Sequence, residues 1–453
     1  MAEQFLRNLH VSNIMRTILT FICLCALFTG FCQSVLKEGQ WYKIGTTEAG
    51  VYKLDHSFFS NTLGVSVNNI DPGTIKVYGN GVRGMLPQPN STPRPNDPKE
   101  LAIFGSGDQY GSFGESDYFL FYSQGPDEFL LDSLGNPAYQ KNLYCDSVYY
   151  FVTYGGAQGK RITTRASVDP VSNVQQTFYD YFIHEKDLYN QLTSGRNWMG
   201  EGFTQGSALQ KFNYDPANFL GNVKLWIALA ADSRGACSFD LSVNQTELGN
   251  VPINPVLDVP YGEKQKFSNA SFESSVSGSE IELSVHFNHA AGNSKGFLDY
   301  FILGAERSLT YTDQTLTLHM PNGKSASFEA ASSTDLTIWN TTDLLNVSAI
   351  PTTKVGNKIS FTTTPAERTA VIFNGSAFPK PVYVKKIVNQ DIKSFKNSDG
   401  LIVTHPRFLS EAKRLAQFHQ TYDNLSVDVV TTDQVYNEFG SGSPDLTAIR
   451  DFL

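Results

Sequence analysis

The strongest constraint on the fold is a change of pattern that begins near residue 399 and continues to residue 453. A Ser-Asp-Gly turn signal at 398–400 precedes a short apolar run at 401–403, which is typical of a buried strand. A second apolar stretch, at 425–430, predicts another strand. The residues between the two runs leave room for a helix, and parallel strands need a connection of that kind.

Helix signals follow both predicted strands. Pro406 suits a first helical position, with Thr404 or His405 before it. Apolar positions then recur at helical spacing, namely Leu409, Ala412, Leu415, Ala416 and His419. A second helix starts at 443–445, and its apolar stripe is Leu446, Ile449 and Leu453. The order strand, helix, strand, helix predicts the opening of a parallel sheet, and because two strands cannot enclose a core, we expect this α/β domain to be incomplete here.

The composition favours a secreted protein rich in β-structure. A length of 453 residues corresponds to about three domains. Aromatic residues make up 13% of the chain and charged residues 17%, which argues against a disordered or coiled-coil protein. The formal net charge of −9 and the absence of a Lys and Arg cluster exclude a nucleic-acid-binding surface.

Residues 1–32 are predicted to be a signal peptide. Arg16 precedes an apolar run at 17–28, and the small residues Gly30 and Cys32 stand before the expected cleavage site. Met15 is an alternative start. The apolar run is too short for a membrane span of about 20 residues, and bulky Phe31 disfavours a lipoprotein site at Cys32.

The mature chain then keeps two cysteines, Cys145 and Cys237. They are too far apart for a metal knuckle, and no Cys-x-x-Cys or His-x-x-x-His spacing accompanies them. Both a disulfide and two buried thiols remain open from the sequence. Neither cysteine has a recognisable histidine partner, so we predict that neither is catalytic.

Three β domains are predicted ahead of the α/β segment at 389–453, with bounds of 33–155, 156–308 and 309–388. In the first, alternating segments at 41–45 and 50–54 predict a hairpin around 46–49, and the residues from 86 to 98 predict a surface loop.

The second β domain shows strict alternation of apolar residues, which is typical of a sandwich or jelly roll. The two clearest faces are Val223, Leu225, Ile227 and Leu229, and Ile281, Leu283, Val285 and Phe287. The third domain has an immunoglobulin-like number of short strands, and Asn322-Gly323 predicts a hairpin between 316–320 and 326–328.

Candidate functional residues are few, and each has an ordinary structural interpretation. His405 follows the first parallel strand, where ligands gather in open α/β sheets, but a helix-capping or packed histidine is the favoured interpretation, because this single histidine has no identified partner. His419 lies on the apolar helical stripe, which predicts a core position. His286 and His289 lie in the sandwich, with neither cysteine near in sequence.

Two further groups have some features of binding sites. Asp108, Glu115 and Asp117 among glycines resemble a calcium cluster, but their spacing does not match an EF-hand and favours a solvated loop. The glycines of 195–202 lack the Gly-Lys-Ser/Thr ending of a phosphate loop. We therefore predict no catalytic, cofactor-binding or metal-binding residue within the chain.

Several segments in a specific order resemble the sortase of the type IX secretion system, a member of the gingipain-like cysteine peptidases. The segments are 41–44 with 50–53, 75–81, 117–122, 194–196 ahead of 200–201, 298–300 and 401–406. The resemblance implies that 389–453 is the start of a caspase-like α/β peptidase domain behind a mainly β, multi-domain region. No His-Gly pair and no cysteine occurs in 389–453, so no catalytic residue is carried over.

The resemblance also implies an activity and its partners. Members of this family use a cysteine thiolate with a histidine partner to remove the C-terminal signal domain of secreted cargo, and they attach the cargo to a lipopolysaccharide acceptor. It implies export through the periplasm to the outer membrane and cell surface, and an outer-membrane β-barrel shuttle protein as a further partner. The alternative from another class is a surface adhesin or carbohydrate-binding protein built of stacked β domains.

Overall fold

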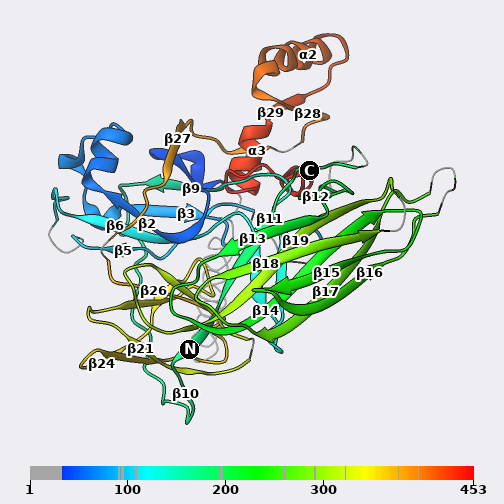
Figure 1. The fold of residues 1–453 in the computed structure, drawn as a ribbon. Helices are drawn as coiled ribbons and strands as arrows, with labels where there is room; N and C mark the ends of the chain where they lie inside the picture. Colours follow the sequence, from blue (N-terminus) through cyan, green and yellow to red (C-terminus); the bar gives the residue numbers. More distant parts are fainter. Residues whose placement is uncertain are drawn as a thin grey trace, which may run out of the picture.

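The computed structural model describes residues 33–453 apart from 90–91, 93–95, 108–110, 192, 194–196, 258, 260–261, 290–291, 322, 376 and 396. The predicted signal peptide at 1–32 lies outside these residues. The fold is mainly β-structure followed by a short α/β segment, so the predicted fold class is confirmed (Figure 1). None of the helices in the described part of the chain has the length and apolar character that a membrane crossing needs.

The N-terminal unit packs a five-stranded sheet against a three-stranded sheet, with a two-stranded ribbon beside them. The larger sheet has the order β27-β1-β9-β3-β4 and the smaller one β2-β6-β5. The strands are β1 Trp41–Thr46, β2 Ala49–Asp55, β3 Lys76–Gly79, β4 Lys99–Glu100, β5 Phe104–Gly105, β6 Tyr118–Gln124, β7 Glu128–Leu131, β8 Pro137–Gln140, β9 Val148–Thr153 and β27 Val382–Ile387. Side chains of both sheets form one core between them, including Ile44, Leu54, Phe121 and Val152.

The hairpin predicted around residues 46–49 is wrong. The strand β1 pairs with β9 and β27, whereas β2 pairs with β6 in the other sheet. The chain therefore passes from one sheet to the other at this corner, because each strand has an apolar face that the facing sheet covers. Local turn residues do not specify which sheet the next strand joins.

The central unit is an antiparallel sandwich. One sheet has the order β11-β19-β14-β17 with β12 beside β19, and the other has the order β13-β18-β15-β16. Its strands are β11 Thr177–Glu185, β12 Gly202–Phe203, β13 Leu209–Tyr214, β14 Phe219–Asp232, β15 Cys237–Val243, β16 Thr246–Ile253, β17 Lys266–Ser275, β18 Ile281–His289 and β19 Lys295–Ser308.

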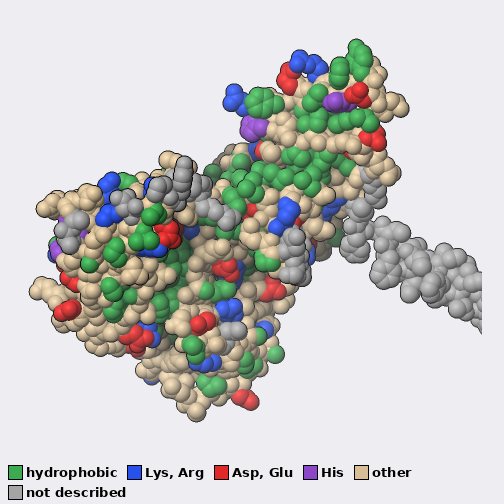
Figure 2. All heavy atoms as spheres, turned by 90° about the vertical axis from the view of Figure 1, so that its right-hand side faces the viewer, with side chains coloured by type: hydrophobic (Ala, Val, Ile, Leu, Met, Phe, Trp, Pro, Cys, Tyr) green, Lys and Arg blue, Asp and Glu red, His purple; other side chains and the backbone are tan. Residues whose placement is uncertain are grey.

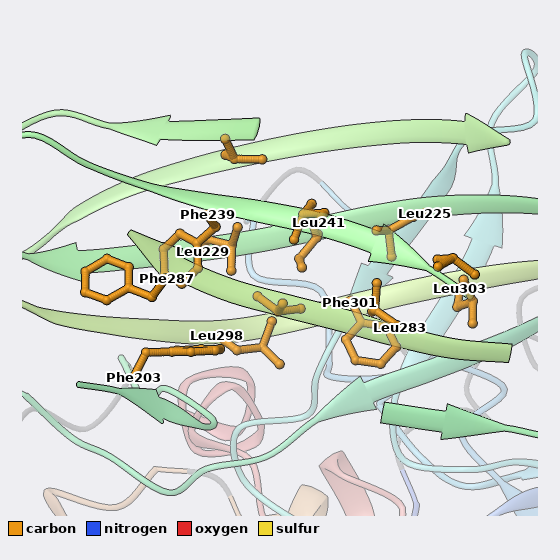
Figure 3. Close-up of a cluster of buried hydrophobic side chains, with 14 of the residues drawn as sticks. Phe203, Leu225, Leu229, Phe239, Leu241, Leu283, Phe287, Leu298, Phe301 and Leu303 are labelled. Atoms are coloured by element: carbon orange, nitrogen blue, oxygen red, sulfur yellow. The ribbon is translucent and has the colours of Figure 1, made fainter. Parts of the chain in front are cut away.

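The core of the sandwich confirms the alternation predicted from the sequence. The predicted faces of β14 and β18 are buried in a single apolar cluster. Phe203, Phe239 and Phe287 lie together at one end of this cluster (Figure 3), and the ring centroids of Phe239 and Phe287 are 4.8 Å apart. The predicted strand at 298–303 is part of the longer β19.

The third unit is also a two-sheet sandwich. Its sheets have the orders β10-β21-β25-β24 and β20-β26-β22-β23. The strands are β10 Val174–Gln175, β20 Leu316–His319, β21 Ser327–Ala331, β22 Thr337–Asn340, β23 Ser348–Ala349, β24 Thr353–Val355, β25 Lys358–Thr362 and β26 Thr369–Phe373. The hairpin predicted at Asn322-Gly323 is wrong, because β20 pairs with β26 and β21 pairs with β25, in different sheets. Asn322 itself lies outside the described residues.

Strands from one predicted domain pair with strands of another in two places. The predicted domain bounds themselves stay predictions. The strand β27, from the predicted third domain, completes the first sheet beside β1. The short strand β10, from the predicted second domain, pairs in parallel with β21. The three β units are thus tied together by main-chain hydrogen bonds as well as by packing.

The C-terminal segment has the predicted order, with one additional helix. Its elements are β28 Gly400–Thr404, α2 Leu409–Tyr422, β29 Val427–Thr431, α3 Thr432–Phe439 and α4 Leu446–Phe452. The strands β28 and β29 are parallel, as predicted. In Figure 1, β28, α2 and β29 project from the β units, while α3 lies close to them.

Candidate functional site

The carboxyl ends of the parallel strands β28 and β29 form the edge at which an α/β fold would hold a ligand. Thr404 pairs with Thr431, so the two strands end side by side. In open parallel sheets the crevice beyond the carboxyl ends of the strands is where ligands bind. His405 follows β28 directly at this edge, and the side chain of Thr431 caps α3.

The structure gives His405 a capping role. Its Nδ1 accepts a hydrogen bond from the backbone N–H of Arg407 at 3.2 Å. This contact caps the 3₁₀ turn Pro406–Phe408, and α2 begins only at Leu409. The imidazole is exposed, and its contacts are those of a local helix start.

The predicted core position of His419 is wrong. Its Nδ1 lies 2.7 Å from Oδ2 of Asp423, one helical turn away, and both side chains are over a third exposed. Only Ala412 and Ala416 are buried on α2. The reason is that a sheet of two strands covers a narrow stripe of the helix, so apolar positions at its sides, such as Leu415 and Phe418, stay half-exposed.

The histidines of the sandwich do not form a site with a cysteine. His286 is exposed on β18, and His289 stacks on Phe287 with ring centroids 5.3 Å apart. His289 pairs in the strand register with Cys237, but the thiol of Cys237 points to the carbonyl of Ile253, at 3.7 Å.

The helix α3 is held against the β units by a buried polar network. Oε1 of Glu438 accepts hydrogen bonds from Nε2 of Gln390 at 2.9 Å and from the backbone N–H of Ile392 at 3.0 Å. Asn437 Nδ2 donates to Oε1 of Gln390 at 3.1 Å. Glu438 is 1% exposed, and burial raises the pKa of its carboxyl. The network fixes α3 to the segment that follows β27.

The loop predicted at 86–98 supplies a second set of contacts at its start. The backbone N–H of Leu86 donates to Oδ2 of Asp445 at 3.0 Å, while Oδ1 of the same carboxylate caps α4 through the N–H of Thr447 at 2.7 Å. Gln88 Nε2 donates to Oγ1 of Thr447 at 2.8 Å. One aspartate therefore both starts a helix and fastens it to the N-terminal unit.

A lysine of the first strand completes this attachment. Lys43 Nζ donates to the carbonyl of Gly442 at 2.5 Å and lies 4.1 Å from the ring centroid of Tyr149. Burial, with nearby Lys385 adding to the effect, lowers the pKa of Lys43 to about 8. Lys385 in turn pairs with Asp433 on α3 at 2.5 Å.

The apolar contribution to this interface is small. Val430, Val435 and Ala448 are completely buried with Leu86 and Ile392 in one cluster. Beside it lies an open cavity of about 600 Å³. Its apolar lining includes Ile392, Phe395, Leu401, Phe439 and Phe452. Figure 2 shows hydrophobic side chains gathered where the projecting part of the molecule joins the body.

Both cysteines of the described chain are free thiols, which excludes the disulfide alternative. Cys145 is half-buried, with Sγ 3.2 Å from the carbonyl of Ser147. Cys237 is buried. Burial raises the pKa of both thiols, and a nucleophilic cysteine needs the opposite shift. The structure thus gives no sign of an activated thiolate at either position.

The calcium-like and glycine-rich groups of the sequence lie partly among the residues that the structure describes. Asp108, Gly195 and Arg196 lie outside the described residues. Asp117 accepts a hydrogen bond from the N–H of Gly114 at 2.8 Å, as in an ordinary loop. Among the residues that the structure describes, no three His, Cys, Asp or Glu side chains are placed to hold a metal ion.

The comparison with known proteins agrees with the geometry of this segment. Residues 393–453 match the family model of peptidase family C25. The chain is also similar to the crystal structure of dimeric latent PorU from Porphyromonas gingivalis, with a TM-score of 0.79, 22% sequence identity and 93% of this chain covered. The predicted resemblance is confirmed. The fold of the chain is the fold found in PorU, and its α/β segment is of the C25 type.

The other similarities are weaker. The chain covers 40% of the PorU chain. A carbohydrate-binding module, CBM36 in complex with calcium and xylotriose, matches 28% of this chain and 96% of its own at 11% identity with a TM-score of 0.17. The delta-endotoxin Cry8Ea1 from Bacillus thuringiensis matches 53% of this chain and 43% of its own at 13% identity with a TM-score of 0.20. Scores this low support no argument. No curated protein sequence matches the chain.

Sequence reasoning missed α3 and the network around Glu438. The signal for the helix was present as a capping box, since Thr431 caps the N–H of Gln434 and the side chain of Gln434 returns to the N–H of Thr431. No comparable signal marks Gln390, because its partners lie on an element more than forty residues later in the chain.

Proposed function

We propose that this chain is the N-terminal part of a cell-surface, sortase-like cysteine peptidase. This peptidase removes the C-terminal signal domain from type IX secretion cargo and attaches that cargo to lipopolysaccharide. The observation that carries the proposal is the presence in one chain of the PorU fold and of a C25-type α/β segment built on β28 and β29. The match of residues 393–453 to the peptidase family C25 model, directly after the β units, supports this proposal.

In this proposal the β units position the peptidase domain. Glu438 holds α3 on the segment that follows β27, and the contacts of Asp445 with Leu86 and of Lys43 with Gly442 hold the C-terminal segment on the N-terminal unit. The nucleophile of such a peptidase is a cysteine thiolate with a histidine partner. We assign neither role to a residue of this chain, since residues 393–453 contain no cysteine and His405 caps a turn.

The proposed partners follow from the same function. They are secreted cargo proteins with C-terminal signal domains, an outer-membrane β-barrel shuttle protein and a lipopolysaccharide acceptor. The proposed route is export through the periplasm, with residues 1–32 removed, to the outer membrane and cell surface. The adhesin alternative is weaker, because a β-domain adhesin has no use for the parallel pair β28 and β29 or for the buried polar attachment of α3.

Deletion of the gene in its native host tests the proposal. Secreted cargo from the deletion strain should keep its C-terminal signal domain in intact-protein mass spectra and should lose the lipopolysaccharide-dependent smear on denaturing gels. Complementation with the intact gene is the control. Normal cargo processing in the deletion strain, together with reduced surface adhesion, would overturn the proposal in favour of the adhesin.

A further inference from the structure

A cavity of about 700 Å³ lies where the three β units meet. Its lining comes from all three units: Gln124, Asp127 and Tyr139 from the N-terminal unit, Tyr181 from the sandwich, and His319 from the third unit. The volume is within the range of small-molecule sites, which are concave, partly aromatic and contain a few polar groups. It is separate from the C-terminal α/β segment.

His319 is the most unusual group in this lining. It is half-buried at the end of β20, and burial, with Arg83 nearby adding to the effect, lowers the pKa of its imidazole to about 4. The ring lies edge-on to Phe129 and Tyr181, with centroid distances of 4.7 and 5.9 Å. Its Nδ1 is buried without a hydrogen-bond partner.

Gln124 presents a second unpaired atom to the same cavity. Its Nε2 donates to the carbonyl of Val82 at 2.5 Å, which fixes the orientation of the amide, whereas its Oε1 is buried without a partner. A buried polar atom without a partner destabilises the fold, and native structures keep few of them. Two such atoms on the lining of one cavity indicate a ligand that supplies hydrogen bonds to both.

Four charged residues of the lining, Arg83, Asp127, Asp180 and Arg307, are already paired within the protein. The other two are Glu48, which is exposed, and Glu185, which hydrogen-bonds to Tyr139 and whose pKa burial raises to about 7. Arg83 Nη2 donates to the carbonyl of Thr341 and to Oγ1 of Thr369, and Arg307 pairs with Asp180. Asp127 accepts from the hydroxyl of Tyr139 at 3.0 Å and from the N–H of Asn142 at 2.8 Å. The two buried lining atoms without a partner, Nδ1 of His319 and Oε1 of Gln124, both belong to neutral groups.

We propose that this cavity binds a neutral saccharide. A sugar hydroxyl donates and accepts hydrogen bonds, so it can serve the amide oxygen of Gln124 and either tautomer of the neutral imidazole of His319. The rings of Phe129, Tyr139 and Tyr181 supply apolar surface for the faces of the sugar. An extended peptide is a poorer match, because peptides are recognised mainly through backbone pairing at a sheet edge, and the two unsatisfied atoms here belong to side chains.

Titration calorimetry of the purified protein with cellobiose, maltotriose and chitobiose tests this inference, with tri-alanine and methyl phosphate as comparison ligands. One saccharide should bind, and His319→Phe, which keeps the ring and removes Nδ1, should weaken its affinity at least tenfold without lowering the unfolding temperature. Gln124→Met should have a similar effect. His286→Phe, at an exposed position on β18, is the matched control and should bind as the parent protein does.

The result is independent of cargo processing, because the assay uses only this chain and no peptidase substrate. Binding of a saccharide that is unchanged in His319→Phe and Gln124→Met would overturn the assignment of the site. Absence of binding by all three saccharides at 10 mM, or binding of tri-alanine or methyl phosphate in their place, would overturn the assignment of the ligand. The value of 10 mM is about tenfold above the 1 mM dissociation constant of weak ligands.

Discussion

The sandwich and the C-terminal segment bury side chains in opposite ways. In the sandwich, β14 and β18 alternate strictly, and the apolar faces of both sheets close over a core with several aromatic rings. In the C-terminal segment, the apolar cluster is small and the attachment depends on hydrogen bonds to Glu438, Asp445 and Lys43. The sandwich is therefore stable through its own sequence, whereas α3 and α4 are placed by residues from distant parts of the chain.

The apolar core mainly stabilises the sandwich, whereas the hydrogen bonds mainly fix the orientation of the C-terminal segment. An apolar core tolerates small shifts of its strands because dispersion and burial have little directional preference. A hydrogen-bonded attachment holds only at one geometry. A segment that begins an α/β domain needs a defined orientation more than it needs a large buried area, and the polar network around Gln390 supplies it.

The largest predicted effect concerns the sandwich core. Phe287→Ala removes a side chain that is 1% exposed and packs on Phe239 and Phe203, and it should lower the free energy of unfolding by about 3–5 kcal/mol. Urea denaturation followed by far-ultraviolet circular dichroism measures the change. Phe267→Ala is the control, because this side chain is 53% exposed on the same sandwich. Equal losses of unfolding free energy for the two variants would contradict a sandwich stabilised by its buried aromatic core.

A smaller and local effect is predicted for the attachment. Glu438→Ala leaves the N–H of Ile392 and an N–H of Gln390 without an acceptor, which should destabilise the C-terminal segment by about 2 kcal/mol. Hydrogen exchange should then accelerate in α3 and α4 while β14 and β18 keep their protection. Glu411→Ala, at an exposed site on α2, is the matched control. Uniform loss of protection would show that the two regions unfold together.

A pH-dependent effect is predicted on the surface of the sandwich that faces the N-terminal unit. Burial, with Asp299 and Asp187 adding to it, raises the pKa of Glu185 to about 7 from 4.5, and the pKa of Asp299 rises to about 6. Between pH 4.5 and pH 7 the Glu185 carboxyl holds more protons in the folded protein than in the unfolded chain, so its contribution to stability falls as the pH rises through this window.

Glu185→Gln removes that dependence at one position. The variant should raise the unfolding temperature at pH 8 and have little effect at pH 4.5 or below, with a difference on the order of 1 kcal/mol because the group is partly exposed to solvent. Differential scanning calorimetry at the two pH values measures it. Glu247→Gln, at an exposed site, should show no difference between them. A Glu185→Gln variant that changes the unfolding temperature equally at both pH values would argue against the raised pKa.

The smallest effect is predicted for the cysteines, one in each region. Cys145 lies near the attachment and Cys237 lies in the sandwich core, and both are neutral thiols. The double variant Cys145→Ser and Cys237→Ser should leave cargo processing by the complete protein unchanged within about twofold, with a stability loss of about 1 kcal/mol at the buried site. Loss of processing in a folded variant would give one of these thiols a catalytic role.

The sequence predicted what depends on local periodicity and missed what depends on partners far along the chain. Alternation over 223–229 and 281–287 identified buried strands, and the apolar runs at 401–403 and 425–430 identified the parallel pair. Both predicted hairpins were wrong, because turn residues report a reversal but not the sheet that receives the next strand. His419 was misplaced because its helix has too little sheet beneath it to bury the whole stripe.

The two unpaired atoms of the junction cavity could not have been predicted for a related reason. Nothing local to Gln124 or His319 marks them, since an unsatisfied buried group is recognised only when every neighbour is known. The alternating pattern of β20 predicts a strand, but it does not tell a histidine that faces a cavity from one that faces solvent.

The pairing of Trp41 with Ile387 has a consequence for how the chain is made. The strand β1 is among the first parts of the mature protein to leave the ribosome, and β27, which covers one of its edges, is among the last of the β units. Until β27 has been synthesised, that edge has no native neighbour, and unpaired edges invite association with other chains. The sheet order β27-β1-β9-β3-β4 is therefore complete only after almost all of the β-structure has been synthesised.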